Sequence, residues 1–128
     1  GLSVLLVDDE PDVRTIAACV LRAAGAQVMV AATADEGLQL LQARLPSVLL
    51  SGIGMPGRDG YDFMRAVRAL PEAAGGRVPA AAFTAFAGED DRERAFAAGF
   101  QAHLAKPVAA DDLVAAVARL ATSPLAFS

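Results

Sequence analysis

Residues 47–56 read Ser-Val-Leu-Leu-Ser-Gly-Ile-Gly-Met-Pro, a short apolar run that ends in a glycine-containing turn. The apolar part has no polar alternation, which is typical of a central parallel strand buried on both faces. Three other short apolar runs occupy residues 4–7, 80–83 and 102–105. Runs of this kind, separated by helical segments, predict an α/β fold in which helices connect parallel strands.

Helix signals fall between these runs. Pro11 begins a helix that Gly25 ends, and Thr33 with Glu36 forms a capping box for a helix to about residue 43. Asp59 precedes a third helix to about residue 70. Two more helices are expected at 89–98 and 110–121, and a further strand at 27–31. We therefore expect five strands and five helices in a doubly wound parallel sheet with right-handed crossovers.

The first helix has an apolar face. Ile16, Val20 and Ala24, with Ala17 and Leu21 beside them, recur at helical spacing and predict its buried face. Cys19, the only cysteine, cannot form an internal disulfide and is expected to be a small buried group in a reducing cytoplasm.

Polar residues follow the strands of the predicted sheet. Three of the predicted strands are followed by polar or charged residues. The first is followed by Asp8 and Asp9, another ends at Thr84, and the last is followed by Lys106 and Pro107. Gly52 closes the central strand and has no side chain. Because ligands bind outside the carboxyl ends of parallel strands, these residues predict one site with a gap at its centre.

Four segments in this order resemble the receiver domain of bacterial response regulators and hybrid histidine kinases: residues 7–10, 53–60, 84–86 and 106–107. The resemblance implies a flavodoxin-like fold with strand order 2-1-3-4-5, a receiver domain at residues 1–121 and a loose tail at 122–128. It also implies a role in two-component phosphorelay signalling, as a regulatory module and not as an enzyme. The segment at 100–107 is similar to receivers of hybrid sensor kinases, so the chain is expected to be a domain of a longer protein.

The same resemblance implies a role for each site residue. Asp8, Asp9 and the backbone carbonyl of Gly54 would hold Mg²⁺, which prefers oxygen ligands. Thr84 and Lys106 would bind the phosphoryl group, Phe86 would be an aromatic switch, and the Lys106–Pro107 bond would be cis. The phosphoacceptor aspartate of the family corresponds to Gly52. We therefore expect Mg²⁺ binding to be weak or absent and phosphorylation to be lost.

Neighbouring residues offer little replacement for the missing carboxylate. Ser51 is expected to point to the opposite face, and Asp59 is expected to cap the third helix. An alternative interpretation is an ordinary Mg²⁺-dependent receiver in its natural form, in which Gly52 is an engineered or unrepresentative change. A small phosphohydrolase and a nucleotide-binding flavodoxin-like module are weaker alternatives, because their motifs are not matched.

Composition limits the partners. The formal net charge of −4 leaves no basic footprint for nucleic acid, and no apolar run approaches the roughly 18–20 residues that span a bilayer. The expected partners are a histidine kinase, a phosphotransfer protein or another signalling protein, in the cytoplasm. They would bind the face of the first helix or the last helix–strand–helix face. The charged run at residues 89–94 is either a solvated helix face or part of such a surface.

Overall fold

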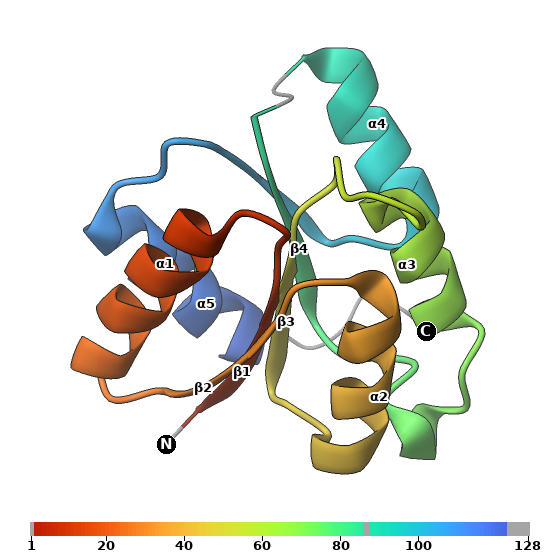
Figure 1. Ribbon diagram of the computed structural model, residues 1–128, viewed down its shortest axis with the longest axis horizontal. Helices are drawn as coiled ribbons and strands as arrows, with labels where there is room; N and C mark the ends of the chain where they lie inside the picture. The colour runs from red at the N-terminus through yellow and green to blue at the C-terminus, as the bar shows by residue number, and fades with distance from the viewer. Residues whose placement is uncertain (1, 86–87, 123–128) are drawn as a thin grey trace.

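The computed structural model describes residues 2–85 and 88–122. Within these residues the chain alternates between strands and helices (Figure 1). The elements are β1 (Ser3–Val7), α1 (Pro11–Ala23), β2 (Gln27–Ala31), α2 (Ala34–Arg44), β3 (Val48–Ser51), α3 (Gly60–Arg68), the 3₁₀ turn η1 (Glu72–Ala74), β4 (Ala80–Thr84), α4 (Glu89–Ala98), β5 (Ala102–Ala105) and α5 (Ala110–Thr122). Of the tail predicted at 122–128, Thr122 is the last residue of α5 and the rest lies outside the described residues, as does the predicted switch residue Phe86.

The strands form one parallel sheet in the order β2-β1-β3-β4-β5, which confirms the expected topology. Val7 at the end of β1 is in register with Ala31 of β2 and Ser51 of β3. Thr84 at the end of β4 is in register with Ala105 of β5. All five strands therefore deliver their carboxyl ends to one edge of the sheet.

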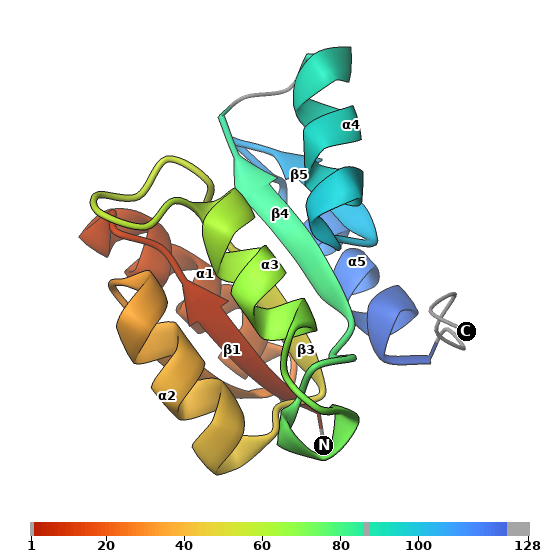
Figure 2. The same ribbon diagram turned by 90° about the vertical axis from the view of Figure 1, so that its right-hand side faces the viewer.

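Helices cover both faces of the sheet. In Figure 1, α1 and α5 lie to the left of the sheet and α2, α3 and α4 to its right; Figure 2 shows α2 and α3 in front of it and α1 behind. Alternate strand residues supply the two cores, so Leu6 and Leu50 pack under α1 and α5, while Leu5 and Leu49 pack with Phe63 of α3. Burial on both faces explains why the central strands are continuously apolar.

The buried face of α1 agrees with the prediction only in part. Ala17 and Leu21 are buried as expected, together with Ala18, whereas Ile16 is 65% exposed and Ala24 is exposed. Cys19 is also exposed, so its expected burial is wrong. The physical reason is that the apolar residues of this helix extend beyond one face, so periodicity alone does not set its rotation. Packing of Ala17 and Leu21 in the core with Leu6 and Leu50 sets it instead.

The helix ends largely follow the sequence signals. Asp59 accepts a hydrogen bond from the Asp62 backbone N–H at 2.9 Å, as expected for a cap. Thr33 likewise accepts one from the Glu36 N–H at 3.2 Å. The Glu36 carboxylate, however, accepts from the backbone N–H of Ala32 at 2.7 Å and not from that of Thr33, so the capping box closes one residue earlier than predicted.

Among the described residues, no helix has the length and apolar character needed to cross a bilayer.

Candidate functional site

The predicted site residues meet at the carboxyl edge of the sheet, because backbone pairing continues one residue beyond the strands. The Asp8 N–H donates to the Ala31 carbonyl at 3.0 Å, and the Gly52 N–H donates to the Val7 carbonyl at 2.7 Å. The Lys106 N–H donates to the Thr84 carbonyl at 2.8 Å. Asp8, Gly52 and Lys106 are therefore held by the same ladder that forms the core.

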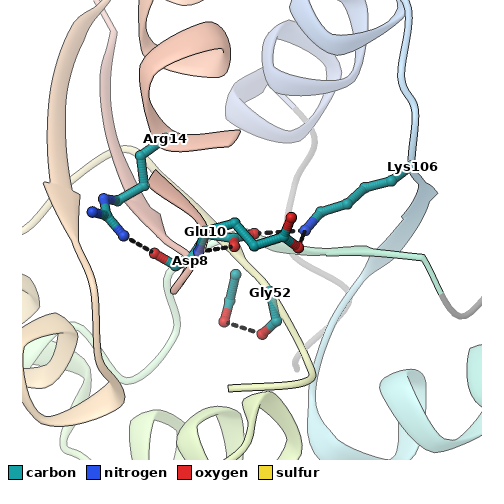
Figure 3. A network of polar contacts seen from close by, with 6 residues as sticks. Asp8, Glu10, Arg14, Gly52 and Lys106 are labelled. Atoms are coloured by element: carbon teal, nitrogen blue, oxygen red, sulfur yellow. Dashed lines mark hydrogen bonds and ion pairs between the residues drawn. The ribbon is translucent and has the colours of Figure 1, made fainter. Parts of the chain in front are cut away.

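Lys106 bridges two carboxylates across this edge (Figure 3). Its Nζ atom lies 2.9 Å from Asp8 Oδ2 and 3.1 Å from Glu10 Oε1. Burial alone would lower the pKa of Lys106, but the hydrogen bonds and charges of Asp8 and Glu10 outweigh burial and raise it. The side chain is only 16% exposed, so this ammonium is a shielded, fixed positive charge.

Asp8 is the buried centre of the network, with 1% of its surface exposed. Its Oδ1 atom accepts from the Glu10 backbone N–H at 3.0 Å, and its carbonyl oxygen accepts from Arg14 Nη1 at 2.7 Å. A buried carboxylate needs such partners, since an unpaired charge in a protein interior is strongly unfavourable. Glu10 and Arg14 were not predicted as site residues. Glu10 directly follows the acidic pair in the sequence, and Arg14 lies in α1, from where it reaches the Asp8 carbonyl oxygen.

Gly52 has no side chain, and the structure shows what fills the space. A Cβ atom built on Gly52 would lie 2.9 Å from Asp8 Oδ2 and 3.2 Å from Asp8 Cγ. Real Cβ atoms do not approach an oxygen so closely, so a side chain at position 52 would require the Asp8 carboxylate to shift. Ser51, fully buried, donates from Oγ to the Gly52 carbonyl at 2.8 Å.

Gly60, at the start of α3, packs its backbone directly against this segment. Its N–H donates to the Ile53 carbonyl at 2.8 Å, and a Cβ atom at Gly60 would overlap the Gly52 carbonyl oxygen. The close approach of two backbones is the reason that this position takes glycine. This contact anchors the turn after β3, which contains Gly54.

Oxygen ligands for a metal are present, but they are already engaged. Carboxylate oxygens of Asp8, Asp9 and Glu10 lie within 4.8 Å of one another, and such a donor set suits Mg²⁺. Two of the three carboxylates are bound to the Lys106 ammonium in this arrangement. The residues therefore do not fit a metal ion unless Lys106 moves away.

The other predicted site residues lie at or just after the ends of strands. Thr84 is 3% exposed at the end of β4, and Gly54 is exposed in the turn after β3. The Lys106–Pro107 peptide bond is cis, as expected.

The family of the chain follows from its sequence as well as its geometry. The sequence profile of the response regulator receiver domain matches residues 4–118. This chain belongs to the response regulator receiver domain family. The receiver is thus a module of two-component signalling.

Relatives of this receiver differ in size. It is 44% identical over 107 residues to an uncharacterised 14.6 kDa protein of Leptolyngbya boryana, covering 84% of this chain and 80% of that one. It is 38% identical over 120 residues to the response regulator Rre1 of Synechocystis, covering 93% of this chain and 51% of the relative. Sensor histidine kinase AruS of Pseudomonas aeruginosa is 34% identical over 123 residues, which are 96% of this chain and 12% of the kinase. The receiver therefore spans about half of one relative and a small part of another.

Solved structures have the same fold. A response regulator structure from Chloroflexus aurantiacus has a TM-score of 0.89 at 33% identity, over 95% of this chain and 98% of that one. The receiver domain of sensor histidine kinase PA1611 from Pseudomonas aeruginosa has a TM-score of 0.87 at 32% identity, over 96% and 99% of the two chains, and was crystallised with magnesium in its active-site cleft.

Proposed function

We propose that this receiver domain works without being phosphorylated, as a protein-interaction module of a two-component system. The observation that carries the proposal is Gly52, which stands where the family has its phosphoacceptor aspartate. Glycine offers no atom that attacks phosphorus, and phosphoryl transfer otherwise depends mainly on positioning and charge. The Asp8 carboxylate beside Gly52 is buried and paired with Lys106, so it is poorly placed to replace that nucleophile.

The partners of this receiver would be histidine kinases, phosphotransfer proteins or other signalling proteins. The outer face of α1 is the proposed contact surface for these partners. Ile16 is exposed there beside an apolar groove of about 460 Å³. The groove is lined by residues of α1, of the segment after β5 and of α5, including Val13, Val20, Val108 and Leu113. An apolar groove with a protruding aliphatic side chain is the kind of surface that a partner helix buries.

The decisive experiment is incubation with acetyl phosphate and Mg²⁺, followed by intact-mass measurement. The chain as given is expected to gain no phosphoryl group. Gly52→Asp is the matched positive control, because it restores the acceptor once Asp8 has turned aside to admit the new side chain. Acid-labile, hydroxylamine-sensitive phosphate on the chain as given would overturn the proposal. If neither protein is modified, the loss extends beyond position 52, and phosphorylation-independent action still holds.

A further inference from the structure

A single ammonium group, that of Lys106, binds two carboxylates of the site at once. Lys106 is the only lysine among the 128 residues, the other ten basic side chains being arginines. It comes from the end of β5 and contacts Asp8 from the end of β1 and Glu10 from the start of α1. Figure 3 shows Lys106 extended across the edge of the sheet toward both carboxylates. One positive charge thus joins segments that are about a hundred residues apart.

Gly52 lies directly against this arrangement. Asp8 Oδ2, the atom that Lys106 contacts at 2.9 Å, is also the atom that a Cβ at position 52 would meet at 2.9 Å. With glycine there, the Asp8 carboxylate holds this place without a close contact and pairs with Lys106. With any larger residue there, the carboxylate would have to shift, and the atom that shifts is the one that Lys106 contacts.

A divalent ion and Lys106 compete for the same oxygens. Of the three carboxylates that lie within 4.8 Å of one another, the ammonium holds those of Asp8 and Glu10. An incoming ion would have to displace a partly buried positive charge, and two cations on the same carboxylates repel each other strongly at short range. Asp9, the third carboxylate, is more exposed than Asp8, and one carboxylate with water is a weak ligand set for Mg²⁺.

We infer that Lys106 is the resident cation of this receiver, and that it excludes divalent metal from the acidic cluster with Glu10 as its second anchor. The negative charge of the site is thereby partly balanced from within the chain, and no ion is needed to hold the carboxyl edge of the sheet together. This inference rests on the proposed function and deepens it, since a site closed by its own lysine keeps one conformation in the absence of both metal and phosphate.

The test is a Mg²⁺ titration of three proteins, followed by the amide NMR shifts of residues 8–10 and 52–54. Lys106→Met removes the ammonium and keeps much of the aliphatic side chain. Arg77→Met is the matched control, because it also changes the formal net charge from −4 to −5 but lies at the amino edge of the sheet, before β4, where Arg77 pairs with Glu72. Lys106→Met is expected to bind Mg²⁺ at least about tenfold more tightly than the chain as given, because the competing charge is gone. Arg77→Met is expected to stay within about threefold, because distant charges are screened.

Equal affinities of Lys106→Met and the chain as given would overturn the inference, as would an equal gain in Arg77→Met. A second measurement uses the unmodified protein, in case Lys106→Met does not fold. Labelling with ¹⁵N-lysine yields one side-chain ammonium signal, which is expected to exchange slowly with water and to stay in place as Mg²⁺ is added. Exchange as fast as that of free lysine, or displacement of the signal by Mg²⁺, would contradict the inference.

Failure here is distinguishable from failure of the proposed function. The readouts above are metal binding and the state of Lys106, whereas the proposed function fails if the chain as given takes up a phosphoryl group.

Discussion

At the scale of single residues, the site is built from close contacts around Gly52. The Asp8 carboxylate lies beside Gly52, and Lys106 Nζ contacts its Oδ2 atom at 2.9 Å. A buried ion pair contributes little net stability by itself, but removing one partner is costly because the other charge is left unpaired. The pair therefore determines the conformation of the site more than it determines the stability of the fold.

Tyr61, the only tyrosine of the chain, provides a residue-scale prediction. Burial raises its pKa above 10.0, an effect that the nearby Arg94 opposes and that Asp91 and Asp59 reinforce. The Arg94 guanidinium lies 4.3 Å from the centre of the Tyr61 ring. Phenolate absorbance is expected to appear at higher pH in the folded protein than in the same protein unfolded by guanidinium.

The raised pKa of Tyr61 also makes the free energy of unfolding depend on pH. Above the unfolded pKa, the unfolded chain releases the Tyr61 proton while the folded chain retains it, so this group lowers the free energy of unfolding as pH rises through that range. Coincident titration curves for the folded and unfolded protein would contradict the prediction, and a curve at lower pH in the folded protein would reverse its sign.

At the scale of elements, α1 serves both the core and the surface. Leu21 and two alanines face the sheet, and Ile16 faces solvent beside the groove formed with α5 and its preceding segment. An exposed isoleucine contributes little to folding, because most of its surface remains in water in the native state. The proposed role of Ile16 is contact with a partner.

Ile16→Glu is accordingly expected to leave the free energy of unfolding within about 0.5 kcal/mol of the original value. The same change is expected to weaken binding to a histidine kinase or phosphotransfer partner by at least about tenfold, because a charge is placed in an apolar contact. Calorimetric titration against that partner measures the effect. Leu45→Glu is the control, since Leu45 is 53% exposed at the end of α2, away from α1. Equal loss of binding in both variants would argue against an α1 interface.

At the scale of the whole molecule, Arg68 connects parts of the fold that lie on one face of the sheet. From the last residue of α3, its Nε and Nη2 donate to the Gly99 carbonyl after α4 at 3.0 and 2.8 Å. Its Nη1 donates to the Gly76 carbonyl before β4 at 3.0 Å. Burial lowers the pKa of Arg68 to about 10, which leaves it charged at neutral pH.

Arg68→Ala is expected to lower the free energy of unfolding by about 2 kcal/mol, because charge-assisted hydrogen bonds to two carbonyls are lost. Arg65→Ala is the control on the same helix. Arg65 is exposed and makes one ion pair with Asp62 at 3.1 Å, which is worth no more than about 0.5 kcal/mol. Urea unfolding followed by circular dichroism compares the two, and equal losses would show that Arg68 does not tie α3 to α4.

Much of this structure follows from the sequence because its signals are local. The apolar runs, the Thr33 and Asp59 caps and the glycines that end α1 and α4 locate all five strands and five helices of the described residues to within a few positions. The strand order came from resemblance to receivers. Strand-end position was also enough to bring Asp8, Gly52, Thr84 and Lys106 to one edge, since parallel strands share their polarity.

Side-chain packing decided the rest. The rotation of α1 was set by which of its apolar residues fit against the sheet. Periodicity alone does not specify this choice, because the apolar residues extend beyond one face of the helix. The partnership of Glu10 with Lys106 and the position of the Asp8 carboxylate beside Gly52 depend on atoms that are close only in the folded chain. By itself, then, the sequence determined the receiver fold and the glycine at the end of the central strand, because both depend on residue type and order. Only the tertiary structure decided which charge closes the site, because that choice depends on distances of about 3 Å between segments far apart in the chain.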